Sequence, residues 1–356
     1  MDQATATRPR PGRRFSFKLA GKAAVRNVAT VALFLVAFDS FASAQVVVTP
    51  QGQVEFIGLK RWTVQMIRDS MAVHAPGKPL GQCAVVLRNL GFPSADAREV
   101  RIAGEPALTV VTLVEPEDSA RVRPRPAPAD SVADLPQWAP ATRIFRGDNY
   151  AFQVALNLRG FRQDSISQAA EISRRRANES NVRVLWRFLD AHRSQRDLEH
   201  ALRTLRSDAN LANSAVALAI LGNFGERDAV WWRLLDVARD VRPGIAATAE
   251  QVLTRLVVTN PRRVDWAPAV PTLRSLLRGT NVFELTSVFG VLTTTKISPR
   301  LAPVLLRDGG GDLALAYMSA RYPRGRDLAR RFLIQLAGRD LGDDADVWAS
   351  WIASFH

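Results

Sequence analysis

The sequence contains only one cysteine and four histidines among its 356 residues. A single cysteine excludes an intramolecular disulfide scaffold and a metal site built from a cysteine cluster. The 20 prolines and 21 glycines are too few for a fibrous chain, and a hydrophobic fraction of 47% is too high for intrinsic disorder. We therefore expect a folded chain that is long enough for two domains, each with its own core.

Acidic residues are also scarce, since 34 of them stand against 48 basic residues. Seven of the basic residues precede an uncharged stretch at residues 27–38, which leads to the small-residue motif Ala42-Ser43-Ala44. This order is typical of a secretory signal peptide. Asp39 ends the apolar run well before the roughly 20 residues that a membrane-spanning helix needs. We expect cleavage after Ala44 and a periplasmic or secreted product whose mature chain has no membrane span.

The export route stays open between the general secretory and the twin-arginine pathways. Arg13-Arg14 followed by Phe15 resembles a twin-arginine signal, although Ser16 stands where a second apolar residue is expected. Removal of a leader with seven basic and two acidic residues would leave 41 basic and 32 acidic residues, a net charge of +9 instead of +14. Part of the basic character, five of the fourteen units of net charge, therefore belongs to the leader.

The segment after the leader has the pattern of a small α+β domain, which we place at residues 45–159. A strand or short hairpin is expected over residues 46–59, because this stretch is β-branched and apolar and is broken by a proline and a glycine. The helical spacing of apolar residues predicts a helix over residues 61–74. An apolar run that ends at a glycine and a proline predicts a second helix over residues 80–90. Strands that pair with each other are expected over residues 106–115 and 150–158.

Six prolines fall within residues 116–140, between the two expected strands. Because proline fixes φ and lacks an N–H donor, this segment cannot lie inside a sheet and should form an extended loop. It is either an insertion in the first domain or a linker. The insertion is favoured because each flanking strand needs a partner for its backbone groups.

From residue 160 to residue 356 the pattern is helical and repeats. A polar residue followed by an apolar residue opens each unit, at Asn181, Asn210, Asp240, Asn281 and Asp312. These anchors are separated by 29, 30, 41 and 31 residues, and each Asn or Asp is expected to cap the helix that follows. Two short helices per unit cannot bury their apolar faces alone. The period therefore predicts a mostly α protein in which the units stack into an α-solenoid.

The repeats resemble the short-period HEAT-repeat family. Asp240-Val241-Arg242, followed by an alanine-lined helix, is similar to the family's pattern of an Asp, a Val-Arg pair and alanines, and Asn181-Val182-Arg183 matches the start of it. The unit at Asn281 departs from the pattern, because Phe283 occupies the position of the arginine. The resemblance covers about residues 160–340 and implies a HEAT-like α-solenoid.

A final helix is expected near the C-terminus. Four large apolar residues there fall at helical spacing after a run of acids, namely Trp348, Trp351, Ile352 and Phe355. Such a stripe suits a capping helix that closes the core of the last unit, since the ends of solenoids need covering.

Residues that would carry chemistry are few, and no catalytic residue, metal site or cofactor is predicted. His192 and His200 are eight residues apart, without the closer i, i+4 pair and third ligand of a zinc site. Cys83 lies in an apolar run and is expected to be a buried thiol. The chain also lacks the nucleophile elbow, the phosphate-binding loop and the dinucleotide fingerprint. An enzyme is therefore less favoured than a binding protein.

The longest unit carries an insertion with Arg262, Arg263 and Trp266. Two planar cations beside an indole suit an anionic or peptide partner, so these three residues form the candidate binding site. The alternative is a solvated loop whose tryptophan covers the edge of the core.

These observations favour an exported, non-enzymatic protein-binding or scaffold protein that uses the surface of its solenoid. A second hypothesis is a HEAT-like enzyme of the lyase type with a pocket at the N-terminal domain. A third is a basic binder of nucleic acid or another anionic polymer, which export makes unlikely for nucleic acid. The expected partner is another protein or a peptide, and the oligomeric state is open.

Overall fold

The computed structural model describes residues 43–101, 104–159 and 165–355, which belong to one compact unit. Residues 1–42, which carry all but the last two residues of the expected export signal (1–44), lie outside the described residues. Most of the described chain is α-helical, and a small α+β domain precedes these helices, as expected from the sequence. No helix among the described residues is both long and apolar enough to cross a bilayer.

The sheet has four strands in the order β1-β2-β4-β3. β1 (Ser43–Thr49) and β2 (Gly52–Leu59) form the antiparallel hairpin expected over residues 46–59. β4 (Leu108–Val114) is the strand expected over residues 106–115. It pairs in parallel with β2 and antiparallel with β3 (Ser94–Val100). The strand β3 was not predicted, because Asp, Arg and Glu interrupt its apolar positions.

Short helices cover one face of this sheet. They are α1 (Val64–His74), η1 (Leu80–Gln82) and α2 (Ala84–Asn89), which confirms the helices expected there. Their apolar side chains share a core with the sheet that includes Ile67, Leu87 and Val111.

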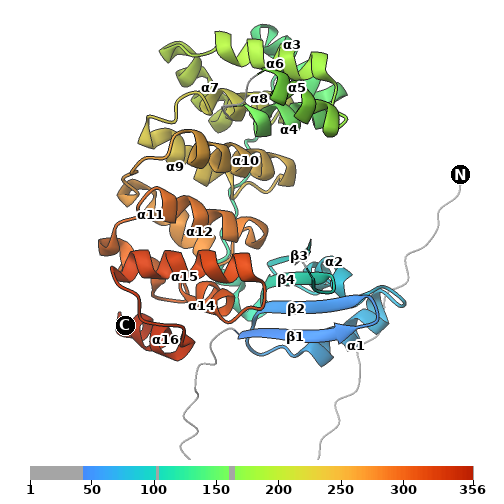
Figure 1. Cartoon of the computed structure of the whole chain (residues 1–356), viewed down its shortest axis with the longest axis vertical. Coiled ribbons are helices and arrows are strands. Elements are labelled where there is room, and N and C mark those ends of the chain that lie inside the picture. Colours follow the sequence, from blue (N-terminus) through green and yellow to red (C-terminus); the bar gives the residue numbers. More distant parts are fainter. Residues whose placement is uncertain (1–42, 102–103, 160–164, 356) are drawn as a thin grey trace, which may run out of the picture. The chain divides into compact units, whose positions relative to one another are not determined.

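The remaining secondary-structure elements of the described residues are helices. They are η2 (Pro116–Arg121), η3 (Pro136–Trp138), α3 (Ala139–Gly147), α4 (Asn149–Leu158), α5 (Ser165–Arg174), α6 (Glu179–Ala191), α7 (Gln195–Ser207), α8 (Leu211–Leu221), α9 (Asp228–Val237), α10 (Pro243–Thr259), η4 (Ala267–Ala269), α11 (Val270–Leu277), η5 (Val282–Glu284), α12 (Leu285–Thr294), η6 (Pro299–Leu301), α13 (Ala302–Leu306), α14 (Asp312–Met318), α15 (Pro323–Ala337) and α16 (Ala345–Ala353). Neighbouring helices pack in succession, with α8 against α10, α10 against α12 and α12 against α15 (Figure 1).

The strand expected over residues 150–158 is wrong, because this segment forms α4. Asp148 caps the helix by accepting a hydrogen bond from the backbone N–H of Ala151 (3.0 Å). Six of the ten residues of α4 are buried, and they lie on more than one face of the helix. A helix buried in this way needs apolar residues on several sides, which explains why the segment is almost continuously apolar. Periodicity alone cannot distinguish such a buried helix from a buried strand.

The repeat anchors do not all cap helices in the expected way. Asn210 does so for α8, because its side chain accepts from the backbone N–H of Ala212 (2.9 Å). Asn181 instead lies inside α6, whose N-cap is Asn178. Asn281 adopts a left-handed backbone with φ of 60°, and its side-chain amide donates to a carbonyl of the α9 end. The period therefore marks turns and helix starts of successive units rather than one type of cap.

Residues 122–135, called the strap below, run from the sheet domain to α3 along those turns (Figure 1). The backbone N–H of Arg123 donates to Oγ1 of Thr280 (2.8 Å), and that of Arg125 donates to the carbonyl of Arg239 (2.8 Å). Farther along, the side-chain amide of Asn213 donates to the carbonyl of Ala133 (3.1 Å). From its first to its last residue, the strap thus contacts the repeats in the reverse of their order in the sequence.

This course changes the interpretation of the proline-rich segment. It leads from β4 into the helix α3 instead of into a second strand, so the reason for favouring an insertion between paired strands is removed. Its backbone groups are satisfied by the repeat turns, which a proline-rich chain can reach without joining a sheet. The expected domain boundary after residue 159 stays a prediction.

The sheet is joined to the last repeats by buried polar contacts. The fully buried carboxylate of Glu55 on β2 accepts from the backbone N–H groups of Arg321 and Tyr322, the latter at 3.0 Å. The hydroxyls of Thr112 and Tyr317 lie 2.7 Å apart. The sheet therefore docks against α14 and the turn that follows it.

The C-terminal helix α16 packs against α14. Trp348 is fully buried, and its indole N–H donates to the carbonyl of Gly342 (2.8 Å). Trp351 and Phe355 are partly buried against the same core. The apolar stripe identified in the sequence thus faces the last helices, as a capping helix requires.

Candidate functional site

The three residues of the expected binding loop are not brought together on the surface. Trp266 is only 1% exposed, and its indole N–H donates to Oγ1 of Thr295 (2.9 Å). Arg262 pairs with Asp228, whereas Arg263 is exposed. The indole belongs to the core, which leaves the arginines as the accessible part of this loop.

Other polar groups singled out in the sequence have structural roles. The ring of His192 lies against Phe188 with 4.0 Å between ring centroids, and that of His200 lies 4.8 Å from Trp138. Burial raises the pKa of the Cys83 thiol to about 12, so this cysteine is not a thiolate at neutral pH. Among the described residues, no group of histidine, cysteine and acidic side chains is arranged to hold a metal ion.

A cleft of about 620 Å³ lies between the sheet domain and the repeats. The end of α2 and the edge strand β3 form one wall, which includes Arg88 and Asp96. The turn before α10, the start of α10 and the segment of η5 form the opposite wall, and the strap contributes Val122 and Pro124. Clefts of this size accommodate a small molecule or a few residues of a peptide.

The position of η5 depends on an unusual turn. Gly279 has a φ of 98°, and a Cβ atom there would lie 2.2 Å from a methyl group of Val114, so only glycine fits this close approach. Asn281 follows in the left-handed region. The turn brings η5 to β3, where a guanidinium nitrogen of Arg98 donates to the carbonyl of Phe283 (2.5 Å).

Two exposed apolar side chains belong to the repeat wall of the cleft. Val241 is 52% exposed and Phe283 is 42% exposed. The guanidinium carbon of Arg98 lies 4.3 Å from the centroid of the Phe283 ring, a cation–π contact that holds the ring beside the strand. The cleft thus offers apolar surface for a ligand.

Glu284 is the most unusual polar group of this wall. It is only 3% exposed, and its carboxyl has no hydrogen bond or ion pair with any described residue. Burial raises the pKa of Glu284 to about 8, and the nearby carboxylates of Glu250 and Asp96 add to this effect while Arg98 opposes it. The carboxyl is therefore mostly protonated at neutral pH.

Asp96 faces the same cleft from β3. Burial raises its pKa, although Arg98, the backbone N–H of Ala97 and Arg88 act in the opposite direction. By contrast, the carboxylate of Asp240 is paired with Arg125 and Arg242. Of these acids, Asp96 and Glu284 are the two whose charged forms the protein disfavours.

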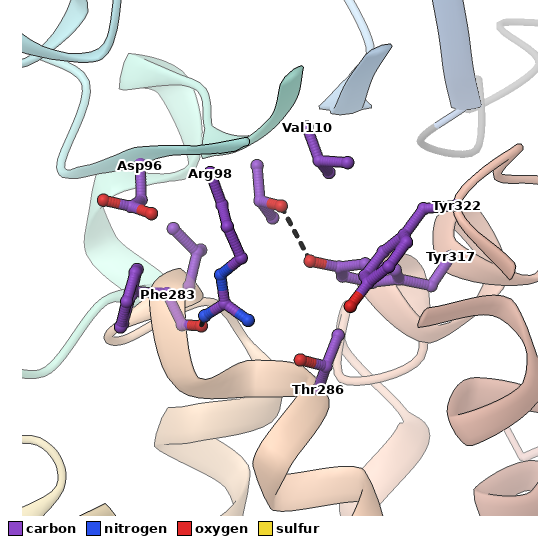
Figure 2. A pocket seen from close by; sticks show the side chains of 9 residues that line it. Asp96, Arg98, Val110, Phe283, Thr286, Tyr317 and Tyr322 are labelled. Atoms are coloured by element: carbon purple, nitrogen blue, oxygen red, sulfur yellow. Dashed lines mark hydrogen bonds between the residues drawn. The ribbon is translucent and has the colours of Figure 1, made fainter. Parts of the chain in front are cut away.

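A narrow pocket adjoins the cleft and shares Asp96 and Phe283 with it (Figure 2). Figure 2 shows Asp96 and Arg98 on the strand side, with the guanidinium group of Arg98 extending toward Phe283. Tyr317 and Tyr322 approach from the helical side. This pocket continues the cleft toward the contact between the sheet and α14.

Sequence reasoning did not select the residues of this cleft. Asp96 lies on a strand that was not predicted, and Glu284 resembles an ordinary acid at the start of a helix. Phe283 did carry a signal, because it replaces the arginine that the repeat pattern leads one to expect. No family model, curated protein or solved structure matches the chain.

Proposed function

We propose that this protein is an exported, non-enzymatic binding protein, and that the cleft between β3 and η5 holds a peptide segment of a partner protein. The observation that carries this proposal is the pair of exposed apolar side chains, Val241 and Phe283, on the wall that also contains Glu284. Apolar surface with a few polar groups is the usual composition of a binding cleft. The expected loop at Arg262 and Arg263 is not part of it.

We also propose that the repeats are HEAT-like. Arg242 supports this, because its guanidinium group donates to the carboxylate of Asp240 (2.8 Å) and to the carbonyl of Ala209 in the preceding unit (2.9 Å). Such contacts resemble the arginine ladder of the family. In the next unit Phe283 replaces the arginine, which frees this position for the cleft.

Selection from a random peptide library on the purified protein tests the binding function. Peptides selected by the wild-type protein should lose most of their affinity for Val241→Asn, because an uncharged polar amide would replace part of the apolar wall. Val258→Asn is the matched control, since Val258 is similarly exposed (55%) but does not line the cleft. Peptides that bind both variants equally well would contradict the proposal.

Export is proposed from the leader pattern, and the hairpin is compatible with it. Cleavage after Ala44 would leave Gln45 to Thr49 in β1, with pairs from Gln45–Phe56 to Thr49–Gly52 retained. Mass spectrometry of the exported product in a bacterial host should give Gln45 as the first residue. The variant Ala42→Arg should block cleavage, and loss of export in Arg13→Lys, Arg14→Lys would assign the twin-arginine route.

A second candidate function is an enzyme that uses Glu284 as a general acid. The favouring observation is its pKa of about 8, because a proton donor works best when its pKa is close to the working pH. Chemically altered peptides after incubation with the wild-type protein, but not with Glu284→Gln, would support this function.

Nucleic-acid binding is not proposed, since many arginines already pair with acids, as Arg125 and Arg242 do.

A further inference from the structure

We infer that the ligand of the cleft carries a positively charged group, a guanidinium or ammonium such as an arginine or lysine side chain, which pairs with Glu284 and Asp96. This inference rests on the proposed binding function and names the class of ligand. It assigns a specificity to two carboxyl groups of the cleft wall, of which Glu284 has no hydrogen bond or ion pair with any described residue.

The first argument is the lack of partners for Glu284. A buried polar group is normally hydrogen-bonded, because losing water without gaining another partner costs free energy. Glu55 and Glu115 follow this rule: they are equally buried, and each accepts backbone N–H groups. Glu284 is the exception among these three: its carboxyl has no protein partner, and its oxygens are not fully enclosed but open to the cleft. A ligand that donates hydrogen bonds would supply what the fold does not.

The second argument concerns which arginine groups are already occupied. The guanidinium groups on the cleft walls bind elsewhere: Arg88 donates to the carbonyl of Ala95 (2.5 Å), and Arg239 donates to Asp236 (2.5 Å). Arg98 is held by the carbonyl and ring of Phe283. Although Nε of Arg239 is buried without a partner, its two terminal nitrogens are bonded. The carboxyl groups of Glu284 and Asp96 therefore remain more available to a ligand than these guanidinium groups.

The third argument is the neighbourhood of the carboxyls. Glu250 on α10 and Asp96 on β3 both oppose ionisation of Glu284, and Arg98 on β3 favours it. An incoming cation would offset the repulsion that Glu250 and Asp96 exert on the ionised form of Glu284. The apolar side chains of Val241 and Phe283 suit the aliphatic stem of an arginine or lysine, which buries its methylene groups while its head pairs with an acid.

This arrangement couples binding to pH. Without ligand, Glu284 is ionised only above pH 8. A bound cation lowers its pKa, so binding near neutral pH must release a proton, and affinity rises as the pH approaches 8. The increase is at most tenfold per pH unit for one released proton. Above pH 8 the affinity should level off.

Equilibrium dialysis with four peptide pools tests the inference. Each pool has arginine, lysine, citrulline or glutamate at a central position, flanked by randomised apolar residues, and bound peptide is quantified by mass spectrometry. The wild-type protein should retain arginine peptides about tenfold better than citrulline peptides, because a charge-assisted hydrogen bond is replaced by a neutral one. Glu284→Gln should remove most of this preference and the rise in affinity with pH.

Two further variants keep the result interpretable. Asp96→Asn lies at a partly exposed position and should reduce the preference for arginine even if Glu284→Gln fails to fold. Val241→Asn tests the cleft itself. Equal retention of arginine and citrulline pools, with loss of both in Val241→Asn, would overturn the inference but keep the binding function. Preference for glutamate would also overturn it, and no retained peptide would overturn both proposals.

Discussion

A guanidinium nitrogen of Arg125 on the strap lies 2.5 Å from a carboxylate oxygen of Asp240 in the third repeat turn. The Asp240 side chain is fully buried and that of Arg125 is nearly so. The backbones of both residues also form an isolated bridge. The segment that the sequence predicts to be an extended loop is therefore held in place by contacts with Asp240, a residue of the repeat motif.

Removing this contact should destabilise the protein. Arg125→Ala would leave Asp240 buried with only Arg242 as its partner, and we expect a loss of about 2–3 kcal/mol in the free energy of unfolding. Urea unfolding measures it. Arg183→Ala is the control, because its ion pair with Glu179 is exposed and should contribute less than about 0.5 kcal/mol. Equal midpoints for the two variants would show that the strap is not fastened here.

The stability of the protein should depend on pH through Glu284. Its pKa is raised from 4.5 to about 8 by burial, so the folded state binds a proton that the unfolded state releases between these values. The contribution of this group is fully present below pH 4.5 and is lost as the pH rises toward 8. The loss is at most about 1.4 kcal/mol per pH unit.

Glu284→Gln stays neutral, so its stability relative to wild type should increase over that pH range. Thermal unfolding at about pH 5.5 and at pH 8 measures the change in this difference. The exposed Glu226→Gln should show no such trend. A constant difference between Glu284→Gln and wild type would mean that the carboxyl is ionised throughout.

Gly58 allows β2 and β4 to approach closely. Its φ is 103°, and a Cβ atom would lie 2.2 Å from the carbonyl oxygen of Leu113. We expect Gly58→Ala to cost about 2–4 kcal/mol, since it combines a left-handed backbone with a backbone clash. Gly77→Ala separates the two causes, because Gly77 has a φ of 77° with no atom within 4 Å and should cost about 1–2 kcal/mol. Chemical denaturation compares them, and similar losses would refute the clash.

The loop at residues 262–266 combines a structural residue with an accessible one. Trp266→Ala should destabilise the protein by about 3–5 kcal/mol, because it removes a buried indole. Arg263→Ala should leave the melting temperature unchanged, since the side chain is exposed. A binding test of this loop is therefore sound only with Trp266 kept, in Arg262→Ala, Arg263→Ala. An unchanged melting temperature of Trp266→Ala would contradict the burial of the indole.

Local patterns were sufficient where a segment determines its own conformation. The hairpin at residues 46–59, the helices after it and the stripe of α16 are visible in the sequence, because turn residues, caps and periodicity act over a few residues. The same holds for the repeat period, which marks the turns and helix starts of successive units. The failure at α4 has a physical reason: a helix buried on several faces has no polar side to reveal its period.

By itself, then, the sequence determined a mostly α chain of repeated helices behind a small α+β domain. Only the tertiary structure decided which side chains lie next to one another in the cleft, because those contacts join residues far apart in the chain. Arg98 and Phe283 are separated by 185 residues, and no local pattern places them on one cleft. Burial likewise moved Trp266 into the core and gave Glu284 its raised pKa, since the surroundings of a side chain are set by packing.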